Sequence, residues 1–305
     1  MPGGDVERLI DGPFADPATR RHLQDTCLRR TVRHAARVSP YYREVLAAHG
    51  IDPSDVAAHT IEKLPLTRKP VVQARAADFV AEGSRPFLST RSTGTTGQPI
   101  WMSRYEADLW PALAACHVLG LIPAAESVRS LAGPFRPTLL VTYPSYLADM
   151  VHAARGIGLG PGDFGLRRID CGGEVLSADL AAAATKTFAA PVTDTFTTTE
   201  VLPVSRRICS QGHLHHDLAT GFVEVVNPAT GHAVAPGDVG TVAVTPYFPY
   251  RECMPLLRYE TRDMVRRLAE DDLTCELAGV PATSAILGNA DHPCVPAARP
   301  AAECR

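Results

Sequence analysis

The sequence lacks the features that mark a nucleic-acid-binding, membrane or secreted protein. Its formal net charge is −3 over 305 residues, so no excess of positive charge favours nucleic acid or an anionic membrane as the main partner. No apolar run reaches the length of a membrane-spanning helix, and the stretch at residues 118–125 is far too short. The first residues carry no basic segment followed by an apolar one, as a secretory signal would. We therefore expect a soluble cytoplasmic protein with neither a nucleic-acid nor a membrane partner.

Cysteine and arginine are not concentrated in any one segment. The eight cysteines lie far apart in a chain without an export signal. Reduced thiols or a metal site are therefore favoured over a disulfide framework. Arginine pairs such as Arg206-Arg207 are scattered, and we expect them on solvated faces.

What is present is an ordinary globular composition, with 45% hydrophobic and 21% charged residues, in a chain long enough for one large domain or a large and a small one. Apolar spacing predicts helices at residues 18–38 and 41–48, separated by Ser39-Pro40. Farther on, short strands alternate with helices; the strands are predicted at residues 138–142, 166–171 and 192–196. This alternation predicts a parallel sheet with helices packed on it.

The pattern changes near residue 204. Short strands joined by turns are predicted there, at residues 223–226, 240–245 and 256–259. They favour an antiparallel, barrel-like subdomain. We therefore expect an α/β part over residues 1–203, a β-rich subdomain over 204–291 and a disordered tail over 292–305. Thr67 and Ser177 are predicted to cap the helices that follow them.

The most informative segment is a loop of hydroxyls and glycines at residues 91–99. Strand-like sequence enters it at residues 87–90 and leaves it at 100–103, which predicts a tight turn between two strands. Such a loop exposes successive backbone N–H groups and several hydroxyl donors, which suits a polyphosphate. It is not the Gly-Lys-Ser/Thr loop of kinases and GTPases, because no Lys follows and no helix opens behind it. A flexible Ser/Thr/Gly linker is the alternative interpretation.

Three further segments place polar or small residues where predicted strands end. Gly172-Gly173-Glu174 follows a strand, at the edge where open α/β sheets bind ligands, and two glycines let the backbone approach a flat ring. Thr199-Glu200 follows the next strand and offers a hydroxyl and a carboxylate to magnesium. Asp263 follows a strand of the β-rich part, with a carboxylate able to accept ribose hydroxyls.

In this order, the segments resemble the motifs of the adenylate-forming superfamily, nearest its phenylacetate–coenzyme A ligase-like branch. The resemblance covers residues 39–291 and includes Tyr143-Pro144-Ser145, which is similar to a substrate segment. It implies the α/β fold of the large N-terminal domain of such enzymes, with mixed and parallel sheets, packed helices and a small β-barrel-like subdomain. It also implies a ligase of natural-product biosynthesis, which activates an aromatic or related carboxylic acid with ATP as an acyl-adenylate for coenzyme A or another acceptor.

The resemblance also implies a role for individual residues. The phosphates of ATP would be held by Ser92, Thr93, Gly94, Thr95, Thr96 and Gly97. Gly172, Gly173, Glu174 and Phe196 would face the adenine, and Asp263 the ribose. Thr199 and Glu200 would bind Mg²⁺, and Tyr143 and Ser145 the acid. Thr96 and Glu200 would be the catalytic residues.

Some positions depart from the family pattern. Gln98 stands where the phosphate loop has a Lys, Asn289 stands where the hinge has an Arg, and the segment between residues 110 and 142 looks short. No room is left after Asp291 for the small C-terminal domain that carries the family's catalytic Lys. Since losing a cation at the developing charge costs several kcal/mol, we expect slow adenylation unless a partner supplies that domain. A homodimer is a further expectation.

Two other functions stay open. One is a non-catalytic protein that binds ATP or an acyl-adenylate, and the other is a scaffold that partners a complete ligase. The acid and the acceptor are not specified by the sequence.

A possible zinc site is implied by the same resemblance. Cys209 and His215 are similar to a Cys…Gly-x-x-His segment that helps to bind structural zinc in this branch. Cys275 matches one further thiol, Leu277 stands in place of the other, and Cys253 is the candidate for the missing ligand. Thiolate and imidazole suit tetrahedral Zn²⁺, although reduced cysteines and surface histidines explain the pattern as well.

Overall fold

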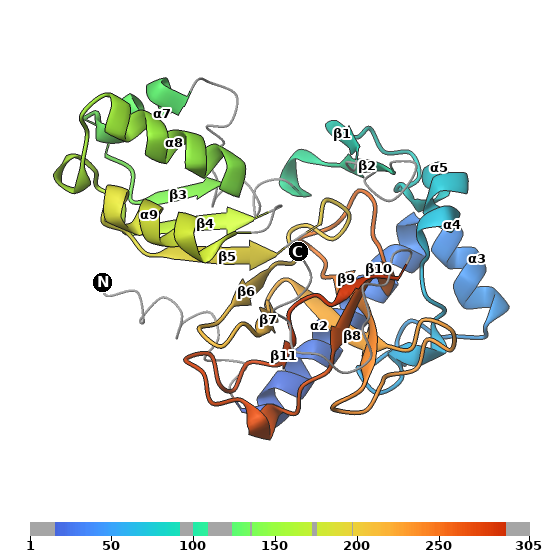
Figure 1. The fold of residues 1–305 in the computed structure, drawn as a ribbon. Helices are drawn as coiled ribbons and strands as arrows, with labels where there is room; N and C mark the ends of the chain where they lie inside the picture. The colour runs from blue at the N-terminus through green and yellow to red at the C-terminus, as the bar shows by residue number, and fades with distance from the viewer. Residues whose placement is uncertain are drawn as a thin grey trace. The chain divides into compact units, whose positions relative to one another are not determined.

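The fold is described from a computed structural model, which covers residues 16–91, 100–108, 124–134, 136–172, 176–196 and 198–290. The chain forms two compact units (Figure 1). Unit 1 consists of Met1–Trp110 and Thr198–Arg305, and unit 2 of Pro111–Thr197. The chain therefore leaves unit 1 and returns to it near the predicted change of character at residue 204.

Two helices begin unit 1. Helix α2 (Pro17–Val38) starts at Asp16, whose carboxylate accepts a hydrogen bond from the Thr19 N–H at 2.7 Å. Ser39 ends α2 and caps helix α3 (Pro40–Ala48), because Pro40 has no N–H to continue the first helix but suits the first turn of the second. The predicted break at Ser39-Pro40 is confirmed.

Short elements follow, and one predicted cap is wrong. They are η1 (Ile61–Lys63), α4 (Lys69–Ala74) and α5 (Ala76–Phe79). Arg68, not Thr67, occupies the N-cap of α4, and it makes no side-chain capping bond. The Thr67 hydroxyl instead hydrogen-bonds the Tyr42 hydroxyl at 3.0 Å. The buried hydroxyl of Tyr42, which lies outside this helix, thus binds the Thr67 hydroxyl that the local sequence predicted as a helix cap.

The predicted strands around the hydroxyl-rich loop are present. Strand β1 (Leu88–Arg91) pairs antiparallel with β2 (Trp101–Arg104), with Arg91 opposite Trp101. The loop at residues 92–99 lies outside the described residues. The hairpin character of the flanking strands is what the sequence predicted.

The C-terminal part of unit 1 holds an antiparallel sheet in the order β12-β10-β9-β8. Its strands are β8 (Gly221–Val226), β9 (Val239–Pro246), β10 (Tyr259–Arg266) and β12 (Gly288–Asn289). Val242, Val244 and Val265 of this sheet share one apolar core with Val32 of α2 and Tyr42 of α3. Burial of these side chains is the main force that joins the two ends of the chain.

A second antiparallel group in unit 1 consists of β6 (Arg206–Ile208), β7 (Leu214–His216) and β11 (Ala282–Thr283). β6 and β7 form a hairpin in which Arg206 lies opposite His216. Gly212 in its loop has φ +77°, a conformation that glycine adopts without steric cost.

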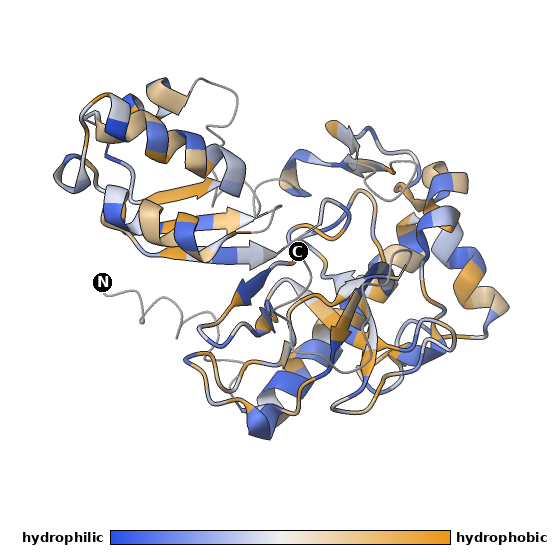
Figure 2. Ribbon diagram, in the orientation of Figure 1, coloured by the Kyte–Doolittle hydropathy of each residue, from blue (hydrophilic) through white to orange (hydrophobic). Residues whose placement is uncertain are grey.

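Unit 2 contains the predicted parallel strands. Its described residues form α7 (Ala124–Ala132), β3 (Leu139–Thr142), α8 (Pro144–Gly156), η2 (Pro161–Asp163), β4 (Arg168–Gly172), α9 (Ala178–Phe188) and β5 (Val192–Phe196). Strands β3, β4 and β5 pair in parallel, and their apolar residues appear in orange in Figure 2. The predicted Ser177 cap is confirmed, because its Oγ accepts from the Leu180 N–H at 3.2 Å. Phe164, Phe188 and Ile169 are buried in a core that belongs to unit 2 alone.

Among the described residues, every helix is too short or too polar to traverse a lipid bilayer.

Candidate functional site

Several predicted site residues lie outside the described residues. They are Ser92, Thr93, Gly94, Thr95, Thr96, Gly97, Gly173 and Glu174. Phe196 ends β5, and only its backbone position is described. The remaining predicted residues are placed as follows.

In unit 2, three predicted residues lie at the carboxyl edge of the parallel strands. Tyr143 follows β3 at the N-cap position of α8 and is 55% exposed, and Ser145 lies in the first turn of α8. Gly172 ends the neighbouring strand β4. A Cβ on Gly172 would come within 2.8 Å of the carbonyl oxygen of Thr195 on β5. Glycine at this position is therefore needed for close approach of the backbone, whatever binds there.

Asp194 at the same edge was not predicted as a separate site residue. It lies opposite Cys171 on β4, and burial raises its pKa from 3.8 to about 6. A carboxyl group with a pKa near neutrality changes its charge in the physiological range. The sequence signal was its place at the start of the segment that leads to Thr199-Glu200.

In unit 1, the structure brings Glu200 and Asp263 into one neighbourhood. Each is close enough to contribute to the electrostatic field at Tyr259, and the Glu200 charge also acts on Asp263. Thr199 beside Glu200 is held through its carbonyl, which accepts from Arg104 Nη2 at 2.5 Å. Two carboxylates from distant parts of the chain thus act on each other electrostatically.

Asp263 presents an acceptor that the described residues leave unused. The β10–β9 register shifts between Glu260 and Met264, Arg262 has φ +68°, and Asp263 lies opposite Asn289 of β12. Its Oδ2 is buried without a hydrogen-bond partner among the described residues. Burial raises the pKa of Asp263, and the charge of Arg206 opposes that shift. A buried carboxylate oxygen in this state fits a ligand hydroxyl as its missing donor.

The predicted solvated position of Arg206 is wrong. Its side chain is buried on β6, and burial lowers the pKa of its guanidinium to about 10, while the Asp263 charge opposes the shift. The adjacent Arg207 points to the other side of the strand, where it is only half-buried. Because two arginines in sequence look alike, only the strand alternation could have separated them.

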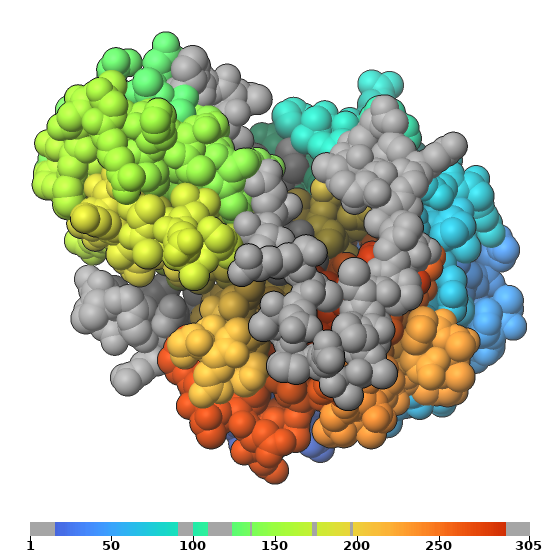
Figure 3. All heavy atoms as spheres, in the orientation of Figure 1, coloured from blue at the N-terminus to red at the C-terminus, as the bar shows by residue number. Residues whose placement is uncertain are grey.

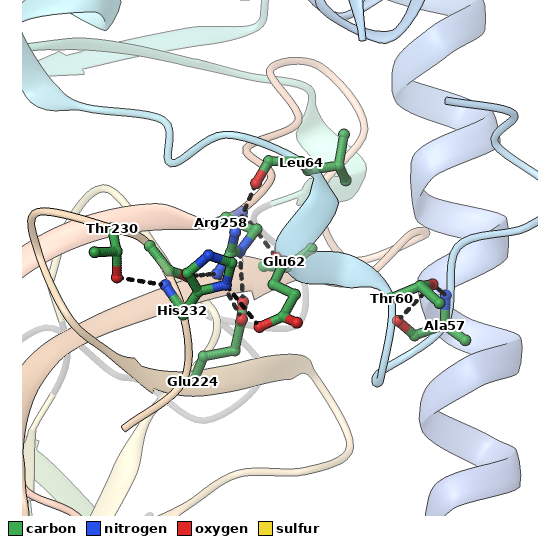
Figure 4. A network of polar contacts seen from close by, with 10 residues as sticks. Ala57, Thr60, Glu62, Leu64, Glu224, Thr230, His232 and Arg258 are labelled. Atoms are coloured by element: carbon green, nitrogen blue, oxygen red, sulfur yellow. Dashed lines mark hydrogen bonds and ion pairs between the residues drawn. The ribbon is translucent and has the colours of Figure 1, made fainter. Parts of the chain in front are cut away.

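Arg258, at the start of the segment that carries Asp263, has a structural role. It is 1% exposed, with φ +48°, and its Nε and Nη2 donate to the two oxygens of Glu224 at 3.1 and 2.9 Å. Its Nη1 donates to the Leu64 carbonyl at 2.6 Å (Figure 4). Burial raises the pKa of Glu224, and Arg258 opposes the shift. A buried bidentate pair of this kind fixes β8 against the start of β10.

A cluster of possible metal donors lies at the β6–β7 loop. The donor atoms of Cys209, His213, His215 and Cys275 lie within 4.8 Å of one another. Figure 3 shows the two segments side by side on one face, gold near residue 210 and red-orange near residue 275. Ser210 joins them, because its N–H and its hydroxyl donate to the carboxylate of Glu276 at 2.8 and 2.6 Å.

Cys253 does not belong to this cluster, which corrects the predicted donor set. Its N–H donates to Asp108 Oδ2 at 3.1 Å, in the segment between β9 and β10. The fourth donor is His213, which the family pattern did not indicate, although it stands four residues after Cys209. Its proximity follows from the tight hairpin loop.

The contacts around the cluster suit a metal. His215 Nδ1 is 2.9 Å from the Val280 carbonyl, so it donates there and leaves Nε2 as an acceptor, 3.2 Å from Cys275 Sγ. Burial lowers the pKa of His215, which favours the neutral form that binds metal. The His213 N–H donates to Cys209 Sγ at 3.3 Å, and His213 Nδ1 has no hydrogen-bond partner among the described residues. Two sulfur and two imidazole donors are a tetrahedral Zn²⁺ set.

Comparison with known proteins finds ligases of similar sequence and fold. No family model matches the chain. Among curated proteins, phenylacetate–coenzyme A ligases of Aromatoleum evansii and Thermus thermophilus are 24% and 25% identical to it and cover 81% and 80% of the chain. The chain spans 66% and 65% of the length of these two relatives.

Among solved structures, an open conformation of 2-hydroxyisobutyryl-CoA ligase in complex with 2-HIB-AMP and CoA has a TM-score of 0.69 at 19% identity. The match covers 90% of this chain and 75% of that chain. The same ligase in the postadenylation state has a TM-score of 0.69 at 20% identity, covering 90% and 69%. The chain is thus similar in sequence to phenylacetate–CoA ligases and has the fold of the large N-terminal domain of adenylate-forming ligases, as its motifs predicted.

Proposed function

We propose that the chain binds MgATP and activates a carboxylic acid, aryl acids above all, as an acyl-adenylate. The observation that supports this most directly is the buried, unused Oδ2 of Asp263 with Glu200 nearby. Ribose hydroxyls would satisfy the first group, and a divalent cation would be held by the second. The relatives are named as ligases of phenylacetate and coenzyme A, which fits this chemistry.

In the proposed complex, the residues keep the roles that their motifs imply. The hydroxyls of the loop at residues 92–97, Thr96 among them, would hold the phosphates, and Thr199 and Glu200 would hold Mg²⁺. Bound magnesium would neutralise phosphate charge. Gly172, Gly173, Glu174 and Phe196 would face the adenine, and Tyr143 and Ser145 the acid. The protein's own contribution is positioning and charge stabilisation of the attack on the α-phosphate.

Coenzyme A is the proposed acceptor, because the curated relatives are named as coenzyme A ligases. A role in natural-product biosynthesis, a cytoplasmic location, a homodimer and a partner that supplies the family's small domain remain predictions. The last is tested by adding such a domain to the assay below.

The direct test combines calorimetry with MgATP and pyrophosphate–ATP exchange over a panel of aryl and small aliphatic acids. We expect heat of MgATP binding in the wild type and a loss of roughly tenfold or more in affinity in Asp263→Asn and in Glu200→Gln. Glu82→Gln is the matched control, because Glu82 is an exposed carboxylate that pairs with Arg43. Exchange with any acid supports activation. Binding without exchange favours the alternative, a non-catalytic ATP- or acyl-adenylate-binding protein. If the protein shows neither binding nor exchange, the result favours a scaffold.

We also propose a structural zinc ion at Cys209, His213, His215 and Cys275. The geometric proximity of four donors of the right chemistry supports it. Elemental analysis of protein purified without added metal should find about one zinc per chain, and Cys209→Ser should lose it, while Cys253→Ser should keep it. Absence of zinc in the wild type, or equal loss in both variants, would contradict the site.

A further inference from the structure

The turn that carries Glu200 is held on both sides by buried guanidinium groups. Arg104 at the end of β2 donates from Nη2 to the Thr199 carbonyl at 2.5 Å. Arg251, between β9 and β10, donates from Nη1 to the Leu202 carbonyl at 3.3 Å. The bonds fall on the residue before Glu200 and on the second residue after it. The backbone around this carboxylate is thus fixed by two separate elements.

Both arginines are almost completely buried. Arg104 is 2% exposed and Arg251 is 0% exposed. Arg251 also donates from Nε to the Met254 carbonyl at 2.9 Å, which fixes the plane of its guanidinium. Burial and these hydrogen bonds restrict the orientation of both guanidinium groups, so the carbonyls that they bind are restricted as well.

A buried carboxylate fixes the backbone on which Arg251 is carried. Asp108, 1% exposed, accepts from the N–H groups of Glu252 and Cys253 at 2.6 and 3.1 Å. It also accepts from the N–H of Tyr105, the residue after Arg104, at 2.8 Å. Asp108 therefore joins the segments that carry the two arginines and supplies negative charge between them.

This arrangement is costly unless a further anion faces it. Burial lowers the pKa of Arg104, and burial together with the charge of Arg104 lowers the pKa of Arg251 to about 9. Asp108 and Glu200 are among the groups that oppose both shifts. Arg104 and Arg251 carry two buried positive charges, and Asp108 supplies one negative charge beside them. The carboxylate of Glu200 can compensate the remaining positive charge. An apolar pair would pack the same space without this penalty, so a role in stability alone does not explain the choice of residues.

We propose that Arg104 and Arg251 are positioning residues for Glu200. They would set the direction of its carboxylate toward the magnesium of MgATP, and Asp108 would hold the pair in place. This inference rests on the proposed function, because it assigns to Glu200 the role of metal ligand. None of the three residues touches the nucleotide; they act through the backbone on either side of Glu200.

The test measures the magnesium dependence of ATP binding, not binding alone. Calorimetry of the full chain with ATP in EDTA and with ATP at increasing Mg²⁺ gives an apparent dissociation constant for Mg²⁺. In Arg104→Gln and Arg251→Gln we expect this constant to rise roughly tenfold, while affinity for ATP in EDTA stays within about twofold. Arg104→Lys keeps the charge and one donor, and it should recover most of the loss.

Arg267→Lys is the control, because Arg267 also donates to a backbone carbonyl, that of Val234, away from Glu200. If the Gln variants fail to fold by circular dichroism, the Lys variants of both arginines replace them, with an expected smaller rise at Arg251, where two bonds depend on the forked guanidinium. If the variants leave the apparent Mg²⁺ dissociation constant unchanged, or lose ATP affinity equally in EDTA, the positioning role is overturned. The proposed function still stands in that case, provided that the wild type binds MgATP. Absence of any MgATP binding in the wild type overturns both.

Discussion

At the residue scale, burial decides what each charged group can do. Arg258 and Asp263 lie five residues apart, yet Arg258 binds Glu224 and two carbonyls, whereas Asp263 keeps a buried oxygen without a hydrogen-bond partner among the described residues. One charge of this segment therefore has a structural partner, and the other keeps an acceptor that no described residue uses. The residue types alone do not separate these two roles.

Asp194 gives the first prediction, since its raised pKa makes stability depend on pH. The unfolded chain ionises this carboxyl near 3.8 and the folded chain near 6, so the folded state binds the proton more tightly. Between these values, stability falls as pH rises, and the penalty persists above pH 6. Asp194→Asn, which stays neutral, should therefore stabilise the protein at pH 8 and leave it unchanged near pH 3.5. We expect a gain of about 1 kcal/mol, well below the full value of the shift, because the side chain is only partly buried and solvent screens its charge.

Urea unfolding at both pH values measures this difference. Asp52→Asn is the control of opposite sign, because hydrogen bonds from Ser54 lower the pKa of the exposed Asp52. That lowered pKa contributes stability above about pH 4 and loses it as pH falls, so the Asn variant should lose stability at pH 8. A gain for Asp194→Asn that is equal at both pH values would exclude the ionisation argument.

At the element scale, helix α8 shows how backbone conformation limits substitution. Gly156 is the last residue of α8, and Gly158 follows it with φ +76°. A Cβ at either position meets nothing within 4 Å, so packing does not distinguish them. Gly156→Ala should stabilise the protein by up to about 1 kcal/mol through helix propensity. Gly158→Ala should destabilise it by about 1 kcal/mol, because a left-handed conformation strains an L side chain.

Thermal unfolding of the two variants tests this pair directly. Both substitutions add one methyl group at the same helix end of unit 2, so each serves as the control for the other. Effects of equal sign would show that the loop after α8 relaxes and that the left-handed conformation is not required.

The elements themselves were largely predictable, because local rules generate them. Apolar runs predicted β3, β4 and β5 close to their observed bounds, Ser177 predicted the start of α9, and Ser39-Pro40 predicted the break between α2 and α3. The Thr67 cap failed because Tyr42, distant in sequence, takes the hydroxyl. The burial of Arg206 and the role of His213 as a fourth donor were missed for a similar reason. The alternation of side chains along a strand determines the surroundings of Arg206, and a tight hairpin loop determines those of His213. The residue types do not reveal either.

At the scale of the whole molecule, each unit has its own core. Val32 of α2 packs with Val242 and Val265 of the C-terminal sheet, whereas Phe188 and Ile169 belong to the core of unit 2. Pairing of the chain's two ends depends on contacts between residues more than 200 positions apart, such as the Leu257 N–H that donates to the Tyr42 hydroxyl. A short stretch of sequence does not contain such a contact. The sequence therefore predicted a division of the chain near residue 203, and it did not predict that the chain returns to unit 1 at Thr198.

Two cores in one chain predict that heating does not produce a single two-state transition. Phe188→Ala removes a buried ring that packs edge-on against Phe164 in unit 2, and it should cost about 3–5 kcal/mol there. Differential scanning calorimetry should show one transition moved to lower temperature and the other in place. Val32→Ala, a smaller cavity in unit 1, is the reciprocal control and should move the other transition by a smaller amount. If both variants shift one common transition, the two cores unfold as one cooperative body, and the apolar contacts within each unit are not what sets its stability.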